Sequence, residues 1–180
     1  MALTAEDGSG VPSAESYASV ALADAYWAAR SHDALSSTWA GAAEADKEGA
    51  LREATGFGDG TYGPFYIGQR RGFVQGLMWP RTFAKDEAGY ELPALPKQVI
   101  EATCELAVRA LSARLAGDQD FGGRVKRIKE KVGSLETETE YVDGAPSTTL
   151  YGSVAGLLAS VLNGLQPDAA PGINATWHWR

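Results

Sequence analysis

The sequence has one cysteine, two histidines and no long apolar run. A single cysteine, Cys104, excludes an intrachain disulfide and is typical of a protein made in a reducing cytoplasm, where it packs as a small buried hydrophobe. His32 and His178 lie far apart, and no Cys or His cluster has the spacing of a metal site. No window approaches the roughly 18 apolar residues of a membrane-spanning helix. We therefore expect no metal, no other cofactor and no membrane contact.

Catalytic signatures are missing as well. The sequence contains no Walker loop, no nucleophile elbow and no plausible Ser, His and Asp arrangement. The stretch "GDGTYG", residues 58–63, matches the dinucleotide-binding fingerprint literally. However, a predicted helix precedes it where a strand is required, and Pro64 follows where a helix should begin. We expect a protein that is not an enzyme.

Positive charge is scarce. The chain of 180 residues has 16 Lys and Arg against 23 Asp and Glu, a formal net charge of −7. Nucleic-acid binding takes most of its affinity from phosphate neutralisation, so DNA binding would need these cations gathered on one face. The length and the hydrophobic fraction of 44% indicate one globular domain with a sizeable core.

Helical patterns dominate what is present. The predicted helices run from Ser19 to Ala29, from Ala42 to Thr55, from Pro96 to just before Gly117, and from Leu150 to Leu162. Five glycines and a proline in residues 56–68 predict that the second helix has ended before that stretch. The expected fold class is mainly α, a small helical bundle with a long central helix. Extended arms at 1–15 and 165–180 flank a domain at 16–164.

Residues 124–142 change to the period of strands and predict one β-hairpin with its turn at Gly133-Ser134. Counting outward from this turn places each cation of one strand opposite a carboxylate of the other: Lys131 and Glu136, Lys129 and Glu138, Arg127 and Glu140. The other face pairs Ile128 with Thr139 and Lys126 with Tyr141. Three opposite-charge pairs specify the register and neutralise what would otherwise be a basic patch.

Residues 68–81, "GQRRGFVQGLMWPR", combine three arginines with aromatic and aliphatic side chains. This composition fits either a platform on which bases stack beside cations or a structural brace. Phe73, Val74, Leu77 and Met78 recur at helical spacing, and no wider basic surface lies nearby, which favours the brace. We expect Phe73, Leu77 and Trp79 to pack on the long helix from Pro96. The arginines Arg70, Arg71 and Arg81 then face an adjacent subunit or solvent.

The chain ends in "LQPDAAPGINATWHWR", where prolines and a glycine oppose regular structure. Trp177, Trp179 and Arg180 are of the types favoured as anchors of protein interfaces. The tail therefore predicts an arm seated on another subunit, the alternative being a tail packed on its own domain.

Several segments occur in an order that resembles a known group of proteins. They are "EDGSGVPSAESYASVALADAYWAAR", "EADKEGALREAT", "QGLMWPR", "LPKQVIEATCELA" and "VKRIKEKVGSLETETEYVDGA". Together they are similar to the head-tail connector, or adaptor, proteins of tailed bacteriophages, and the resemblance spans nearly the whole chain. Some similar chains are described as DnaT-like single-stranded-DNA-binding proteins. The glycines of residues 56–68 depart from the connectors, in which the second helix continues regularly.

The resemblance implies a mainly helical structural protein of the virion neck, made in the host cytoplasm. It would assemble as a homo-oligomeric ring, commonly of twelve copies, below the portal protein. The ring would extend the channel for genomic DNA, which passes without specific binding, and would dock the stopper or tail-completion protein. The implied portal-binding arm contains Ile173, Trp177, Trp179 and Arg180. Candidate inter-subunit residues are Arg70, Arg71, Arg81, Arg127, Lys129, Lys131, Glu136, Glu138 and Glu140.

Two other functions remain open. A single-strand-binding module would stack bases beside the arginines of residues 68–81, using the aromatic residues Tyr62, Phe65, Tyr66, Phe73 and Trp79. A small helical interaction protein of no viral origin is the third. Strong, salt-sensitive binding of an oligonucleotide would distinguish the second function from the connector.

Overall fold

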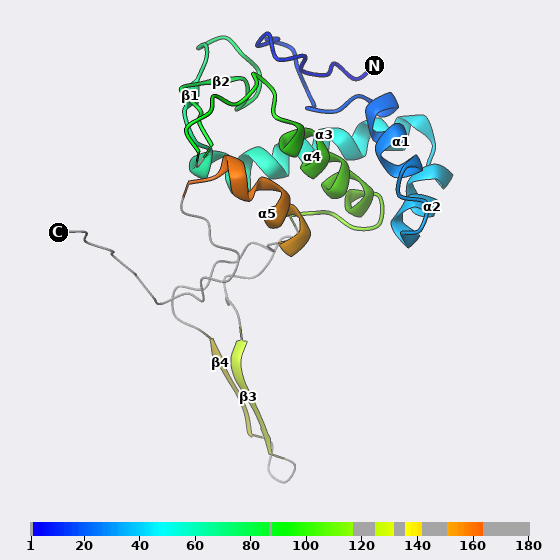
Figure 1. Ribbon diagram of the computed structural model, residues 1–180. Coiled ribbons are helices and arrows are strands. Elements are labelled where there is room, and N and C mark those ends of the chain that lie inside the picture. Colours follow the sequence, from blue (N-terminus) through cyan, green and yellow to red (C-terminus); the bar gives the residue numbers. More distant parts are fainter. Residues whose placement is uncertain (1, 87, 117–124, 132–135, 142–150, 164–180) are drawn as a thin grey trace, which may run out of the picture. The chain divides into compact units, whose positions relative to one another are not determined.

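The computed structural model describes residues 2–86, 88–116, 125–131, 136–141 and 151–163. The chain divides into two compact units. The helical unit comprises Met1–Leu115 and Tyr151–Pro167, and the hairpin unit comprises Ala116–Leu150 and Asp168–Arg180. Helices are the predominant regular structure among the described residues (Figure 1), which confirms the mainly α fold class with one longer β-hairpin. The domain boundaries at residues 15 and 164 remain predictions.

Two short helices begin the helical unit. Helix α1, Val20–Ala28, starts where predicted, because the Ser19 side chain accepts a hydrogen bond from the amide of Leu22. Helix α2, Ala34–Gly41, is missing from the sequence prediction. Its serines and threonine are weak helix formers, but Asp33 caps its start and Trp39 is buried. The Asp33 cap and the burial of Trp39 together stabilise this helix despite the low helix propensity of its residues.

Helix α3, Glu44–Tyr62, corrects the prediction that residues 56–68 cannot be helical. It continues through three glycines because its buried face packs along helix α4, Lys97–Ala110. A Cβ atom at Gly58 would lie 3.7 Å from Leu106 Cδ1 of α4, so a small residue suits this contact. Tertiary packing therefore outweighs the low helix propensity of glycine. The predicted departure from a regular continuation of this helix is therefore wrong.

Helix α4 lies in the middle of the core, as predicted, although α3 is the longest helix described. Val99, Thr103, Leu106 and Ala107 of the predicted face are buried. The helix ends at Ala110, earlier than the predicted stop at Gly117. Cys104 is fully buried, as expected, and burial raises the pKa of its thiol to about 12. Helix α5, Gly152–Leu158, packs on α4 and continues as a 3-10 turn at Ala159–Val161.

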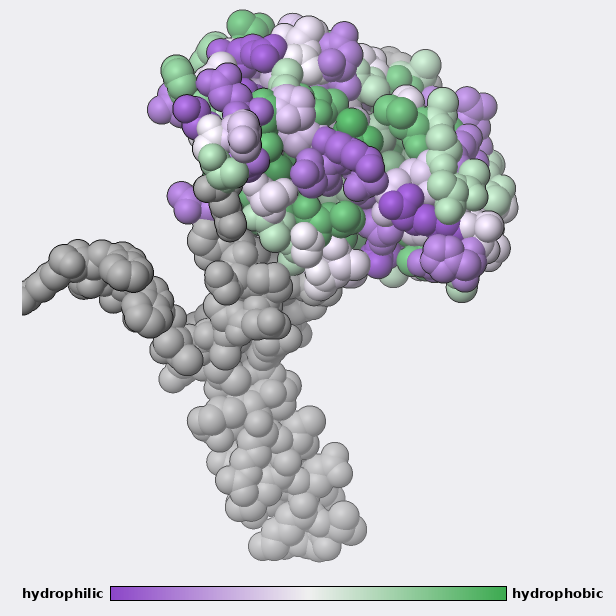
Figure 2. All heavy atoms as spheres, in the orientation of Figure 1, coloured by the Kyte–Doolittle hydropathy of each residue, from purple (hydrophilic) through white to green (hydrophobic). Residues whose placement is uncertain are grey.

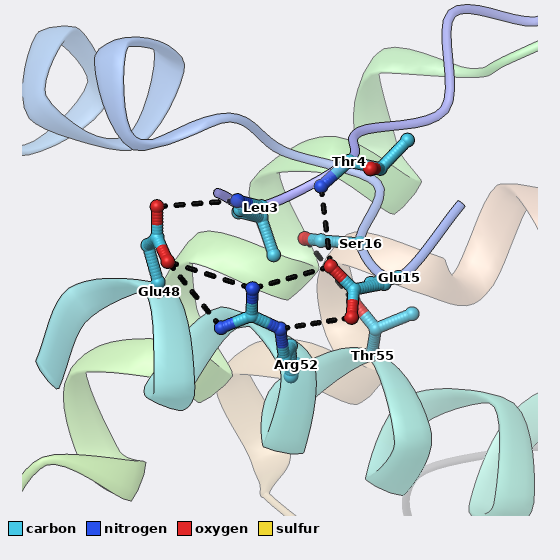
Figure 3. A network of polar contacts seen from close by, with 7 residues as sticks. All are labelled: Leu3, Thr4, Glu15, Ser16, Glu48, Arg52 and Thr55. Atoms are coloured by element: carbon cyan, nitrogen blue, oxygen red, sulfur yellow. Dashed lines mark hydrogen bonds and ion pairs between the residues drawn. The ribbon is translucent and has the colours of Figure 1, made fainter. Parts of the chain in front are cut away.

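The N-terminal arm is extended but anchored on α3 (Figure 3). The guanidinium of Arg52 lies 3.1 Å from a carboxylate oxygen of Glu15 in the arm and 3.5 Å from Glu48 on its own helix. Glu48 and Glu15 also accept hydrogen bonds from the amides of Leu3 and Thr4. The ion pair between Glu48 and Arg52 follows from their spacing of four residues, whereas the contacts to the arm come from tertiary structure.

The hairpin unit contains strands β3, Val125–Lys131, and β4, Glu136–Tyr141. Their register confirms four predicted pairs: Lys131 and Glu136, Lys129 and Glu138, Arg127 and Glu140, Ile128 and Thr139. The predicted pair of Lys126 and Tyr141 is wrong, since Tyr141 faces Val125. An irregularity between Val125 and Arg127 shifts the register there by one residue, as a β-bulge does. The turn at Gly133-Ser134 lies outside the described residues.

Candidate functional site

The stretch 68–81 forms a short antiparallel ladder closed by a long loop. Strand β1, Gln69–Arg70, pairs with strand β2, Arg81–Thr82, and residues 71–80 form the loop between them. The loop begins after the 3-10 turn Gly63–Phe65 that ends α3 and contains a cis peptide bond between Trp79 and Pro80. The apolar residues of the loop have helical spacing, but residues 71–80 contain no helical turn.

Gln75 holds the 71–80 loop together from the inside. Its side chain is buried, at 6% exposed. Its Oε1 accepts a hydrogen bond from the amide of Gly72 at 2.8 Å, and its Nε2 donates to the carbonyls of Leu77 and Pro80 at 2.8 and 3.0 Å. One buried side-chain amide thus bonds three backbone groups of the loop, of which the Pro80 carbonyl also accepts from the amide of Arg71 at 3.1 Å.

The three arginines brace the same loop by donating to carbonyl oxygens. Arg81 donates to the carbonyls of Tyr66, Ile67, Gly68 and Met78, the shortest contacts being 2.7 Å. Arg70 donates to the carbonyl of Gln75 at 2.7 Å, and Arg71 donates to that of Gly8 at 2.8 Å. The expectation that Arg81 is free to meet a neighbour is therefore wrong, because its guanidinium serves the backbone around it. Arg70 and Arg71 remain exposed beyond these single contacts.

Asp59, a half-buried acid of α3, connects the loop to the segment between the N-terminal arm and α1. The hydroxyl of Tyr17 donates to the two carboxylate oxygens of Asp59, with distances of 2.7 and 2.9 Å, and accepts from the amide of Trp79. The amide of Met78 donates to Asp59 Oδ2 at 3.0 Å. Desolvation raises the pKa of Asp59, against the opposing effects of these hydrogen bonds and of two nearby arginines. The network fixes the second half of the loop on the core.

The aromatic residues proposed for base stacking are mostly inside the protein. Tyr62, Tyr66 and Trp79 are 0 to 6% exposed, and the rings of Tyr66 and Trp79 meet edge to face with centroids 5.8 Å apart. Burial of Trp79 agrees with the predicted brace. Only Phe65 and Phe73 of the five reach the surface, at 41 and 99% exposed. These five residues do not form a continuous stacking platform.

The outermost part of the loop is apolar, and we call Phe73 and Val74 the apolar tip. Their exposed fractions are 99 and 73%. The expectation that Phe73 packs on the long helix is therefore wrong, since the backbone bonds of Gln75 and Arg70 turn this part of the loop outward. Figure 2 shows hydrophobic and hydrophilic residues interspersed over the visible face of the helical unit. Two adjacent apolar side chains so strongly exposed on a braced loop are uncommon on the surface of a soluble monomer.

Sequence reasoning missed the groups that organise this site: Gln75, Asp59 and Glu6. A polar residue inside an apolar run was the one available signal for Gln75. In the sequence, Asp59 stood out only as part of "GDGTYG", the match to the dinucleotide-binding fingerprint that its context excluded. Glu6 is 4% exposed and accepts backbone hydrogen bonds from Gly8, Gly10 and Val11. The signal for it was an acid just before the glycines of "EDGSG".

The remaining predicted site residues do not belong to this loop. The hairpin charges at 127–131 and 136–140 belong to the hairpin unit. The portal-binding residues Ile173, Trp177, Trp179 and Arg180 lie outside the described residues. Within the described part of the chain, no group of three or more potential ligands could hold a metal ion. The same residues include no helix long and apolar enough to cross a membrane.

These features define a mainly helical protein with an anchored N-terminal arm and a braced surface loop. The chain belongs to the family described as "Putative DnaT-like ssDNA binding protein", which matches residues 1–174. No curated protein and no solved structure matches the chain. The family confirms the expected resemblance to DnaT-like chains. The relation to head-tail connectors stays a prediction.

Proposed function

We propose that this protein is a structural head-tail connector of a tailed bacteriophage. It would form a ring below the portal, extend the DNA channel and dock the stopper or tail-completion protein. The observation that carries the proposal is the apolar tip. A loop whose polar groups are engaged internally holds Phe73 and Val74 out to solvent, and exposed apolar side chains of this kind serve protein contacts.

The electrostatics of the site support a protein partner. The arginines beside the aromatic residues donate to backbone carbonyls, which leaves less capacity for phosphates. The chain as a whole carries a net charge of −7, and an acidic ring lets DNA slide through without adhering. The neck location, the portal and the stopper come from the resemblance of the sequence and are part of the proposal.

Single-strand DNA binding is the second candidate, and the family description favours it. In this structure the contact would have to use Phe65 and Phe73 with the free donors of Arg70 and Arg71. Tyr62, Tyr66 and Trp79 would stay in the core. A site of this kind predicts affinity that falls steeply with salt and depends on Phe73.

Titration of a fluorescent oligonucleotide tests the two functions against each other. The connector predicts no binding tighter than about 1 µM at about 0.15 M salt. Sub-micromolar binding that weakens steeply with added salt, and that Phe73→Ala abolishes, would replace the connector by the DNA-binding function. The matched control is Tyr90→Ala, which removes an aromatic side chain that is 74% exposed and lies outside the five.

Docking to the portal protein of the same genome tests the predicted C-terminal arm. A chain truncated before Ile173 is expected to lose docking and to keep the unfolding curve of the parent. Docking that survives the truncation would overturn the assignment of Ile173, Trp177, Trp179 and Arg180. Portal and major capsid genes immediately upstream would be independent support for the neck role.

A further inference from the structure

The apolar tip is preorganised for insertion into a partner. Gln75 and Arg70 fix the backbone behind it, and the amide of Gly76 donates to the carbonyl of Val11 in the N-terminal arm. A Cβ atom at Gly76 would lie 2.8 Å from the carbonyl oxygen of Pro12, so loop and arm touch closely. A side chain presented on a fixed backbone loses little conformational freedom when it docks.

The helical unit also has an open groove of about 430 Å³, which we call the α2–α4 groove. It lies between the end of α2, the first half of α3 and the end of α4. Ala45, Gly49, Ala50 and Leu111 line its apolar part. A Cβ atom at Gly49 would meet nothing within 4 Å, so the groove has room for side chains from outside.

Charges at the tip and at the groove are complementary. Arg70 and Arg71 flank the tip, and among the described residues neither has a carboxylate within ion-pair distance. Asp46 and Glu53 line the groove, and neither is paired with a cation within the same part of the chain. Opposite charges around an apolar contact favour one orientation and speed association.

The two surfaces lie at opposite ends of the helical unit. The ladder β1–β2 that carries the loop is at one end and α2 is at the other (Figure 1). One molecule therefore cannot fill its own groove with its own tip. A contact between different surfaces of two copies is head-to-tail, and such contacts generate rings when the rotation closes.

We propose that Phe73 and Val74 of one copy insert into the α2–α4 groove of the next copy, with Arg70 and Arg71 near Asp46 and Glu53. The ring in the neck rests on the proposed function, but the contact itself does not. The occupant is a second copy because the same chain supplies the apolar tip, the groove of small residues and both signs of charge.

Two variants block one surface each. Phe73→Ser with Val74→Ser removes the exposed tip, and Gly49→Phe fills the groove from inside. The control is Gly56→Phe, because Gly56 is also an exposed glycine of α3 with nothing within 4 Å of its Cβ position, but does not line the groove. Asp46→Lys serves as a second groove variant if Gly49→Phe fails to fold. Circular dichroism and thermal melting establish folding for each.

Sedimentation velocity over a range of concentrations up to about 500 µM measures self-association, and contacts of this kind dissociate at micromolar levels or weaker. Tip and groove variants are expected to weaken it at least about tenfold, as removal of a central contact does, whereas Gly56→Phe matches the parent. A mixture of the tip variant with the groove variant should form a dimer and nothing larger, because one intact tip meets one intact groove.

For weak association, Val74→Cys mixed with Gly49→Cys should give a disulfide-linked heterodimer under mild oxidation, and Val74→Cys mixed with Gly56→Cys should not. A parent that stays monomeric and gives no such crosslink would overturn the inference. So would tip variants that associate like the parent, or a mixture without dimers.

Portal docking is measured on the same variants. If the variants associate like the parent and still dock, only the inference of a head-to-tail contact is wrong. If the mixture forms the dimer but no docking to the portal is seen, only the proposed neck role is wrong.

Discussion

Gly68 is the residue on which the geometry of the braced loop depends most directly. Its φ of +75° lies in the left-handed region, which glycine adopts without strain. A Cβ atom there would lie 2.5 Å from the carbonyl oxygen of Thr82 and 2.8 Å from the amide nitrogen of Ala84. The obstacles are backbone atoms of β2 and of the residues just after it, so they cannot rotate away as a side chain would.

We expect Gly68→Ala to lower the free energy of unfolding by about 2 to 4 kcal/mol, since strain and clash act together. Urea denaturation measures the change. Gly72→Ala is the matched control in the same loop, because a Cβ atom there meets nothing within 4 Å and φ is not positive. Equal stability of the two variants would show that β1 and β2 do not pair as described.

Asp59 predicts a pH dependence of stability with a defined sign. Burial raises the pKa of its carboxyl in the folded protein above the ordinary value of 3.8. The native state then holds the proton more tightly than the unfolded chain. The stabilising contribution is complete below 3.8 and is lost as the pH rises through the native pKa.

The difference in unfolding free energy between the parent and Asp59→Asn should therefore shift against the parent as the pH rises from about 4 to about 7. Denaturation curves at several pH values give this difference. Asp7→Asn is a control of opposite sign, because hydrogen bonds from Ser9 lower the pKa of Asp7. A difference for Asp59→Asn that does not change with pH would contradict the desolvation of this carboxyl.

At the scale of elements, the N-terminal arm owes its conformation to one buried carboxylate. Oε1 of Glu6 accepts from the amides of Gly8 and Gly10, and Oε2 accepts from Val11, each at 2.9 Å. The two glycines have φ values near +90°, which points successive amides at one anion. Through Gly8 and Val11 the arm then contacts the 71–80 loop.

Glu6→Ala leaves one buried and two part-buried donors without this acceptor and should cost about 2 to 4 kcal/mol of stability. It should also speed amide exchange at Gly76, which donates to the arm. Asp7→Ala provides the comparison, because Asp7 is exposed and accepts one reported backbone hydrogen bond, from Ser9. Equal losses of stability and equal amide exchange at Gly76 in the two variants would contradict the role of Glu6 in fixing the arm.

At the scale of the whole molecule, stability should reside in the helical unit. The buried hydrophobic residues described, including Trp27, Trp39 and Trp79, belong to it. Replacing residues 118–148 by a flexible linker of about ten residues should leave the melting temperature within a few degrees, because no described core contact is removed. Calorimetry measures the transition. A large drop in its midpoint would mean that the two units stabilise each other.

Local patterns determined much of this fold. A serine cap placed the start of α1 at Ser19, and a proline placed the start of α4, which begins at Lys97, one residue beyond it. Alternating charges set four cross-strand pairs of the hairpin, because a period of two and a short turn leave little choice. The burial of Cys104 followed from its residue type, since a lone cysteine packs as a small hydrophobe.

Only the tertiary structure decided the continuation of α3 and the directions of the side chains in the 71–80 loop. Helix α3 passes through its glycines because α4 packs against it, a gain that local propensity does not contain. Arg81 turns inward to four carbonyls, and Phe73 turns outward. The reason is the irregular backbone of this region. Its carbonyls that pair with no other backbone group need side-chain donors, and the sequence does not show which arginines will supply them. The sequence by itself therefore determined the starts of α1 and α4 and four pairs of the hairpin register, and the tertiary contacts determined α2, the length of α3 and which side chains of the 71–80 loop reach the surface.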